Sequence, residues 1–267
     1  MSVDVNYHTH TNFCDGNNSP REMIEYAIAL GFTHLGFSGH MDADIHMNFD
    51  EYVSEVRKLQ FEYSDRIDVF CGVELDNLYE QVCWLTTDYV IGSTHFLDVD
   101  YYRPLSIDNT VEDVVTLCNE FYGGDYYKLC RAYYELEAKI CDKFPCTFIG
   151  HFDLVSKYNY ILHCFDEDDD KYLTPAFDAM ECLVKQDIPF ELNTRQSDRG
   201  KFYPSNTLLK RLKELNGKVI ISSDAHNAFE LNKGFDDAVE LLKKCGFRYS
   251  YMLVRDEGKT KLKEFLL

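Results

Sequence analysis

The sequence predicts an α/β protein in which seven strand–helix units close into a barrel of parallel strands. Short apolar β-like runs alternate with helical patterns along the chain, an order typical of parallel sheets. Most of these runs are continuously apolar, as expected for strands covered on both faces. There are seven of them and no glycine-rich dinucleotide fingerprint, which favours a barrel over a doubly wound sheet.

Each element has its own signal in the sequence. The predicted strands span 3–8, 34–40, 68–75, 89–96, 147–153, 189–194 and 219–226. The first predicted helix has Ser19 as N-cap, Pro20 at its first position and Gly31 as its stop. Helical patterns follow at 49–63, 111–143 (one long helix or two), 172–186, 205–215 and 235–245, and a last βα unit is predicted from 247 to the end.

Length and charge limit the classes of function. The 267 residues, 45% of them hydrophobic, suit one large α/β domain or two small ones, and no linker or internal repeat divides them. The formal net charge of −19 makes a nucleic acid a poor partner and argues against an exonuclease. A small anionic substrate stays possible where metal ions or local basic residues reverse the field inside a pocket.

Cysteine usage and the N-terminus predict a cytoplasmic location. None of the ten cysteines is spaced C-x-x-C, so a zinc ribbon or a redox pair is not expected. The first residues, MSVDVNYHTH, do not resemble a signal peptide, and no apolar run is long enough for a membrane span. We therefore expect reduced thiols and no membrane partner.

Polar residues gather where the predicted strands end. In a strand, side chains at i and i+2 point to one face, so His8 and His10 would leave the first strand together. Six of the nine histidines lie at such carboxyl ends, which converge on one mouth of a parallel barrel. The set at the strand ends, with Asp15 just after the first, is His8, His10, Asp15, His40, Glu74, His95, His151, Arg195, Asp224 and His226.

The nitrogen and oxygen donors of this set predict a metal centre. Six imidazoles and three carboxylates are enough for two or three divalent ions. Imidazole suits Zn, Fe and Mn, and the lack of a cysteine ligand argues against a purely structural zinc site. Ions placed close together are the usual apparatus of phosphate ester hydrolysis. The sequence therefore predicts a metal-dependent phosphoesterase.

The order of the motifs resembles the PHP (polymerase and histidinol phosphatase) family of metal-dependent phosphoesterases. The motifs are HTH at the first strand, then GH, GVE, GSTH, GHFD and SDAH, and they span residues 8–226. The resemblance implies one domain over 1–267 with the family's distorted (β/α)7 TIM-like barrel and a trinuclear metal site. The segments HTHTNFCDG and GHFDLVSKY, with the chain length, resemble the histidinol-phosphate phosphatase branch. That branch implies a phosphoric monoester hydrolase that converts L-histidinol phosphate to L-histidinol and phosphate in histidine biosynthesis.

Carried over by residue, the resemblance implies roles for the individual side chains. The first ion would be held by His8, His10, Glu74 and Asp224, the second by Glu74 as a bridge with His95 and His151, and the third by Asp15, His40 and His226. A hydroxide bridging two ions would be the nucleophile, with Glu74, Asp224, His226 and Arg195 in the catalytic set. Arg195 and Lys157 would hold the phosphate, although Lys157 stands where arginine is expected and offers a point charge instead of a fork.

Several residues keep two interpretations. His46 follows the second strand and could protonate the leaving alkoxide in the substrate pocket. Asp42 and Asp153 could orient the ligand histidines two residues before them, or face a helix terminus. The aromatic insertion at 98–110 could wall the pocket, with Arg103 reaching the substrate, or pack on itself at the surface. His34 is expected to be structural, and His163 has no assigned role.

Two other functions stay open at the level of sequence. The same metal site could act on another small phosphate ester, such as a nucleotide, with different pocket walls. A non-catalytic metal-binding PHP module is the second alternative, which the complete ligand set argues against. The sequence predicts neither the native metals nor the oligomeric state.

Overall fold

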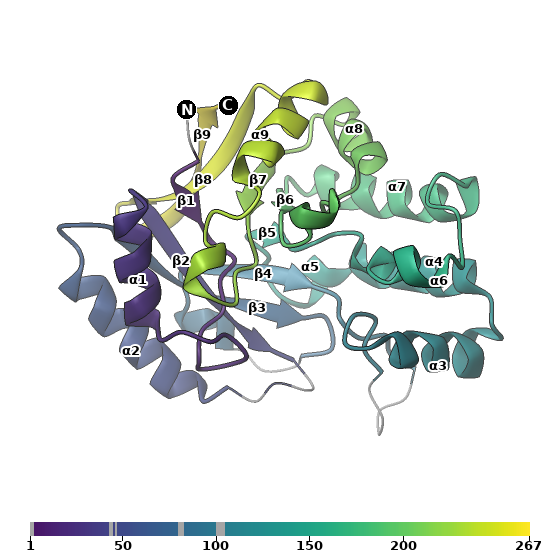
Figure 1. Cartoon of the computed structure of the whole chain (residues 1–267), viewed down its shortest axis with the longest axis horizontal. Coiled ribbons are helices and arrows are strands. Elements are labelled where there is room, and N and C mark those ends of the chain that lie inside the picture. Colours follow the sequence, from purple (N-terminus) through teal and green to yellow (C-terminus); the bar gives the residue numbers. More distant parts are fainter. Residues whose placement is uncertain (1–2, 43–44, 46, 80–82, 100–104) are drawn as a thin grey trace.

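Seven parallel strands follow one another in chain order around a nearly closed barrel (Figure 1). The structure is a computed structural model and describes residues 3–42, 45, 47–79, 83–99 and 105–267. Every neighbouring pair from β1–β2 to β6–β7 is parallel. The strands are β1 (Val5–Asn6), β2 (His34–Met41), β3 (Asp68–Asp76), β4 (Tyr89–Ser93), β5 (Phe148–Ile149), β6 (Phe190–Asn193) and β7 (Val219–Ser222). The predicted fold class is confirmed.

The barrel closes just beyond the carboxyl ends of β1 and β7. Thr9 and Ala225 form an isolated parallel bridge there. The amide of His10 donates to the carbonyl of Ala225 at 2.8 Å, and the amide of Ala225 donates to the carbonyl of His8 at 3.1 Å. This closure places the HTH segment directly beside the SDAH segment, although the two bridged residues, Thr9 and Ala225, are 216 positions apart in the chain.

Helices surround the strands (Figure 1). The first, α1 (Pro20–Ala29), begins with a capping box in which Ser19 and Glu22 satisfy each other's backbone N–H groups, and Gly31 follows it with φ of 82°. The other helices are α2 (Phe49–Glu62), α3 (Val111–Tyr122), α4 (Tyr126–Glu137), α5 (Ile140–Lys143), α6 (Asn159–Leu162), α7 (Asp170–Lys185), α8 (Asn206–Glu214) and α9 (Phe235–Lys244).

The segment 111–143 forms three helices, where the sequence predicted one or two. Gly123 and Gly124 both have positive φ, 62° and 76°, which ends α3. Asp125 then caps α4, because its carboxylate accepts the amides of Tyr127 and Lys128. Apolar spacing continues across these breaks, so periodicity alone does not reveal them.

The predicted final βα unit is wrong, because the chain ends in an antiparallel hairpin. Strands β8 (Tyr249–Asp256) and β9 (Lys259–Leu266) pair along their whole length. The two linking residues, Glu257 and Gly258, both have positive φ (50° and 76°), the conformation of a tight hairpin turn. The alternation of lysine with apolar residues in β9 has the period of a strand.

Aromatic side chains fill the barrel below the mouth. The hydroxyl of Tyr89 donates to the carbonyls of Tyr7 and Phe37, at 2.6 and 2.9 Å. The phenol group of Tyr89 lies so close to Gly36 and Gly72 that neither position has room for a Cβ. The lower barrel is therefore a packed core, and the open volume lies at the carboxyl ends of the strands.

Two further sequence expectations bear on the described residues. The cysteines whose side chains are described are all free. Within the described part of the chain, no helix is both long enough and apolar enough to cross a membrane.

Candidate metal centre and active site

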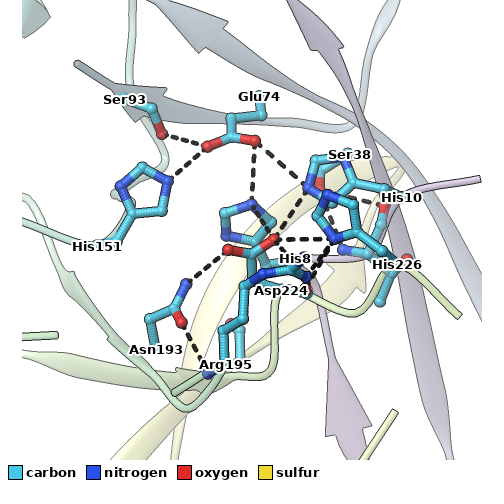
Figure 2. A network of polar contacts seen from close by, with 12 residues as sticks. His8, His10, Ser38, Glu74, Ser93, His151, Asn193, Arg195, Asp224 and His226 are labelled. Atoms are coloured by element: carbon cyan, nitrogen blue, oxygen red, sulfur yellow. Dashed lines mark hydrogen bonds and ion pairs between the residues drawn. The ribbon is translucent and has the colours of Figure 1, made fainter. Parts of the chain in front are cut away.

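All nine predicted ligands converge on the barrel mouth (Figure 2 labels six of them). His8 and His10 follow β1, His40 and Glu74 lie in β2 and β3, and His95, His151 and Asp224 follow β4, β5 and β7. Asp15 comes from the loop before α1, and its Oδ2 lies 2.9 Å from Nε2 of His226. Residues spread over most of the sequence thus meet because parallel strands end at one rim.

Glu74 faces five of the ligand histidines with its two carboxylate oxygens (Figure 2 labels three of these histidines). Its Oε2 lies 3.1 Å from Nε2 of His8, 3.4 Å from Nε2 of His10 and 3.2 Å from Nδ1 of His40. Its Oε1 lies 2.8 Å from Nε2 of His151 and 3.3 Å from Nε2 of His95. The two oxygens therefore face different histidines, which is the geometry expected of a bridging carboxylate.

Two acidic residues complete the other side of the cluster. Oδ1 of Asp224 lies 3.3 Å from Nε2 of His10 and 3.7 Å from Nε2 of His8. Asp15 approaches His40 as well as His226, with its Oδ2 3.8 Å from Nε2 of His40. Asp15, His40 and His226, together with His10, have ligand atoms within 4.8 Å of one another.

The residues present fit divalent cations. Four buried ligand atoms have no hydrogen-bond partner among the described residues: Nε2 of His8, Nε2 of His10, Nδ1 of His40 and Oε2 of Glu74. Orphaned polar atoms at this depth are costly unless something occupies the space between them. Three nitrogens directed at one carboxylate oxygen form the donor set of a transition-metal ion. Which ligand serves which ion stays a prediction.

The charges within the ligand cluster shift the pKa values of its own carboxylates and imidazoles. Burial opposes ionisation of Glu74, but the charges of His8, His40 and His95 hold its pKa well below the ordinary value. Burial and the neighbouring His40 and His226 lower the pKa of His10 to about 3, so this imidazole is neutral at pH 7. Burial lowers the pKa of His95, but the charge of Glu74 and the contact with Asp76 outweigh this effect and raise the pKa well above its ordinary value. Cation binding there must release protons.

Two buried carboxylates hold the ligand histidines from behind, and the sequence analysis missed both. Oε1 of Glu191 lies 2.7 Å from Nδ1 of His8, while its Oε2 accepts the amide of His151 at 2.8 Å and the side chain of Asn193 at 3.0 Å. Oδ2 of Asp76 lies 3.5 Å from Nδ1 of His95 and accepts its amide at 2.8 Å. The only signal in the sequence is an acid inside an apolar strand, PFELN or GVELD.

A cavity of about 310 Å³ opens over the ligands, and both predicted phosphate clamps line it. One terminal nitrogen of the Arg195 guanidinium donates to the carbonyl of Asp224 and approaches Nδ1 of His226. Nζ of Lys157 donates to the carbonyl of Asp108 at 2.7 Å and to its carboxylate at 3.1 Å. Arg195 therefore lies against the metal ligands. Lys157 is instead held by Asp108, which precedes it by 49 positions in the chain.

The insertion at 98–110 contributes to the cavity wall, as one of its two interpretations required. Ser106, Asp108 and Asn109 line the cavity, and Ser106 pairs with Phe96 as an antiparallel bridge. Arg103 and His46 lie outside the described residues, so their proposed contacts with substrate stay predictions.

Asp42 and Asp153, which each follow a ligand histidine by two residues, differ in their contacts. Oδ2 of Asp42 lies 3.4 Å from Nδ1 of His40, the nitrogen that also faces Glu74, so Asp42 lies beside the ligand histidine. Asp153 instead accepts the amide of Ser205, the N-cap of α8, at 3.0 Å. His34 is partly buried at the start of β2, 3.5 Å from the carboxylate of Asp68, and His163 ends α6 with φ of 47°.

One more buried acid lies behind the strand that carries His95. Glu137, at the end of α4, is fully buried and accepts a hydrogen bond from the hydroxyl of Thr94. Its other oxygen has no partner among the described residues. Burial raises the pKa of Glu137 to about 8, with the Thr94 hydroxyl opposing this. The carboxyl is therefore neutral over much of the physiological range.

The chain is similar to several known proteins along almost its whole length. It is 29% identical over 260 residues to a probable histidinol-phosphatase of Deinococcus radiodurans, covering 90% of this chain and 93% of that protein. It is 28% identical over 285 residues to a histidinol-phosphatase of Lactococcus lactis, covering 97% and 99% of the two.

Solved structures share the fold at lower identity. The crystal structure of histidinol phosphate phosphatase from Lactococcus lactis, complexed with Zn, L-histidinol and phosphate, superposes with a TM-score of 0.72 at 23% identity, covering 97% and 98% of the chains. A putative histidinol phosphatase from Listeria monocytogenes gives a TM-score of 0.74 at 21% identity, covering 87% and 99%. A family model of the PHP domain matches residues 6–195, the segment from β1 to Arg195. The chain belongs to the PHP domain family.

Proposed function

We propose that this protein hydrolyses a small phosphate monoester in a metal-dependent reaction, with L-histidinol phosphate as its substrate and L-histidinol and phosphate as products. Relatives that carry the histidinol-phosphatase name are 28% and 29% identical over 97% and 90% of the chain, which supports this substrate. We further propose that residues 1–267 act as one domain in the cytoplasm, without nucleic-acid partners.

The observation that carries the proposal is the set of unpartnered buried donors around Glu74. Nε2 of His8, Nε2 of His10 and Nδ1 of His40 all lie within 3.4 Å of its Oε2. This arrangement supports two or three divalent ions, of Zn, Fe or Mn, shared through the two oxygens of Glu74. Bound divalent ions supply a phosphatase with an activated water and with neutralisation of the phosphate charge.

The protein's own residues account for ligand orientation and substrate placement. Glu191 accepts the proton on Nδ1 of His8, which keeps Nε2 of that ring as the ligand atom. Arg195 lies in the cavity wall 3.8 Å from Oδ1 of Asp224, where its planar fork is available to two phosphate oxygens beside the metal ligands. Lys157 adds a second positive charge in the same wall.

The complete ligand set also argues against a non-catalytic module. A domain that had lost its activity would be free to lose ligands, yet all nine donors remain and lie at one mouth beside a cavity. A different small phosphate ester would require only a change in the cavity wall, so the substrate needs a direct test.

Phosphate release from L-histidinol phosphate, set against a panel of sugar phosphates and nucleotides, tests the proposal. The purified protein is assayed after loading with Zn, Fe or Mn, and its metal content is measured in parallel. We expect His95→Ala to lose both metal and activity. His163→Asn is the matched control, because this histidine lies outside the cluster and asparagine tolerates its positive φ. A loaded protein that releases phosphate from no ester overturns the proposal.

A further inference from the structure

We propose that Asp108 recognises a positively charged amino group on the alcohol portion of the substrate, so that phosphate esters of amino alcohols are the preferred class. This inference rests on the proposed function and names the feature of the substrate that the cavity wall selects. The observation behind it is a partly buried carboxylate, with 23% of its side chain exposed, that lines the cavity beside Lys157 and belongs to no group of metal ligands.

The loop that carries Asp108 is fixed against the metal centre. Its residue Ile107 is buried, with 1% of its surface exposed, and donates its amide to the carbonyl of His95 at 2.9 Å. Ser106 pairs with Phe96, next to the same ligand. From the other side, the hydroxyl of Tyr158 donates to the carbonyl of Asp108 at 2.9 Å. The carboxylate is thus held in place before any substrate arrives, as recognition of a single ammonium requires.

The carboxylate of Asp108 has acceptor capacity to spare. Its Oδ1 accepts the hydroxyl of Ser106 at 2.7 Å, and its Oδ2 accepts Nζ of Lys157 at 3.1 Å. An ionised carboxylate offers about four acceptor directions, so these two bonds leave room for a third donor. Burial opposes ionisation, but the charge of Lys157 brings the pKa of Asp108 down to about 2, so it is anionic at neutral pH.

The charges of the cavity wall match a zwitterion. Apart from the metal ligands, the described residues that line the cavity include two bases, Lys157 and Arg195, and two acids, Asp42 and Asp108. Asp42 is turned to His40, as described above, which leaves Asp108 as the acid beside a phosphate-binding cation. L-Histidinol phosphate carries an ammonium two carbons from its phosphate ester oxygen. Its phosphate would meet the cations while its ammonium meets Asp108.

The same wall disfavours purely anionic substrates. A sugar phosphate brings the negative charge of its phosphate into the cavity but no cation to Asp108, whose spare acceptor positions would stay unused. Selection by a charge that only one class of substrate can match is a common source of specificity. The proposed preference is therefore for the ammonium itself, and only secondarily for the imidazole ring.

Two esters that differ only in the amino group test this inference. They are L-histidinol phosphate and 3-(imidazol-4-yl)propyl phosphate, assayed with the metal-loaded protein. We expect the wild type to favour the amino ester in kcat/KM on the order of 10- to 100-fold, the effect of one charged hydrogen bond. Asp108→Asn should lose most of this ratio, by lowering kcat/KM for the amino ester while changing the des-amino ester less than about threefold.

Three further variants separate recognition from structural effects. Lys157→Met should lower kcat/KM for both esters alike, because the phosphate is common to them. Asp187→Asn is the matched control, since that exposed aspartate also pairs with a lysine, Lys218 at 2.6 Å, at the opposite end of the strands. Ser106→Ala removes one hydrogen bond from Asp108 and should shift the ester ratio in the same direction by less, which keeps the test valid if Asp108→Asn does not fold.

The outcomes are distinguishable from failure of the proposed function. Equal losses on both esters in Asp108→Asn would mean that the residue only holds Lys157, and the inference would be wrong although the protein is a phosphatase. A wild type that hydrolyses both esters equally well would overturn it in the same way. A protein that hydrolyses neither ester, nor any other monoester, contradicts the proposed function instead.

Discussion

Replacing Glu191 by glutamine should weaken the metal centre without touching any predicted ligand. The carboxylate of Glu191 is fully buried and accepts three hydrogen bonds, from Nδ1 of His8, the amide of His151 and the side chain of Asn193. Glutamine keeps the shape but has only one acceptor oxygen, and its NH₂ group is a donor. At least one of the three bonds must therefore be lost or inverted.

Either orientation of the new amide has a calculable cost. If its oxygen faces His8, the NH₂ group meets two other donors, and leaving such buried groups unpaired costs about 1–3 kcal/mol of the free energy of unfolding. If its NH₂ group faces His8, the imidazole proton moves to Nε2, the atom 3.1 Å from Oε2 of Glu74. That nitrogen would then have no lone pair for a metal, and we expect affinity to fall about 10- to 100-fold.

Denaturant unfolding of metal-free protein measures the first effect, and metal titration against a competing chelator measures the second. Glu181→Gln is the control, because Glu181 lies on the surface of α7 and pairs with Lys185 at 3.0 Å. Wild-type metal affinity together with wild-type stability in Glu191→Gln would refute the reasoning, since they would show that the carboxylate neither sets the ring orientation of His8 nor holds the other two buried donors.

Three other perturbations test separate parts of the site. Glu74→Ala should nearly abolish phosphate release and remove more than one ion from the protein, because both carboxylate oxygens face ligand histidines; metal analysis of the variant measures this. Arg195→Ala should lower kcat/KM by about 30- to 1,000-fold, equivalent to about 2–4 kcal/mol, with metal content unchanged, and Lys157→Ala is assayed beside it. Glu137→Gln should gain stability over the wild type as pH rises from about 5 to 8, by about 1.4 kcal/mol per pH unit. The folded carboxyl stays protonated up to a pKa of about 8, while the unfolded one ionises near 4.5, so the wild type loses stability across this window and the variant does not; urea unfolding at several pH values measures it.

Each of these results has a contrary outcome. Full metal content and turnover in Glu74→Ala would disprove its bridging role. Loss of metal in Arg195→Ala, or an unchanged rate on the best ester, would make Arg195 a structural residue. Parallel stability curves for Glu137→Gln and the wild type would mean that the folded carboxyl is ionised in the core.

The barrel and the convergence of its ligands could be predicted because both follow from one regularity. Parallel strands end at the same rim, so a histidine or acid at each strand end implies a shared site without any knowledge of distances. His95 and His151, for example, lie in segments that are far apart in sequence, yet each directly follows an apolar run. Strand ends were more predictable than helix breaks, because apolar spacing continued through Gly123 and Gly124.

Residues that act through long-range contacts could not be predicted in this way. Glu191 and Asp76 occupy strand positions, where side chains alternate between faces and an acid gives no sign of its partner. The contact between Asp108 and Lys157 depends on how the insertion folds back beside His95, which no local pattern specifies. The C-terminal hairpin was missed for a different reason: its turn, Glu257–Gly258, carries a weaker signal than Asn–Gly or Asp–Gly.

The position of the barrel seam links the fold to the chemistry. β1 has two residues and β7 has four, and the isolated bridge between Thr9 and Ala225 pairs the chain just beyond their carboxyl ends. His8 and His10 flank one side of that bridge, and Asp224 and His226 flank the other. Backbone pairing at the seam therefore brings two histidines to one carboxylate, at 3.7 and 3.3 Å from Oδ1 of Asp224. Cations held between them would join the two ends of the barrel sheet directly, so ligand binding at this seam would add to the closure of the barrel.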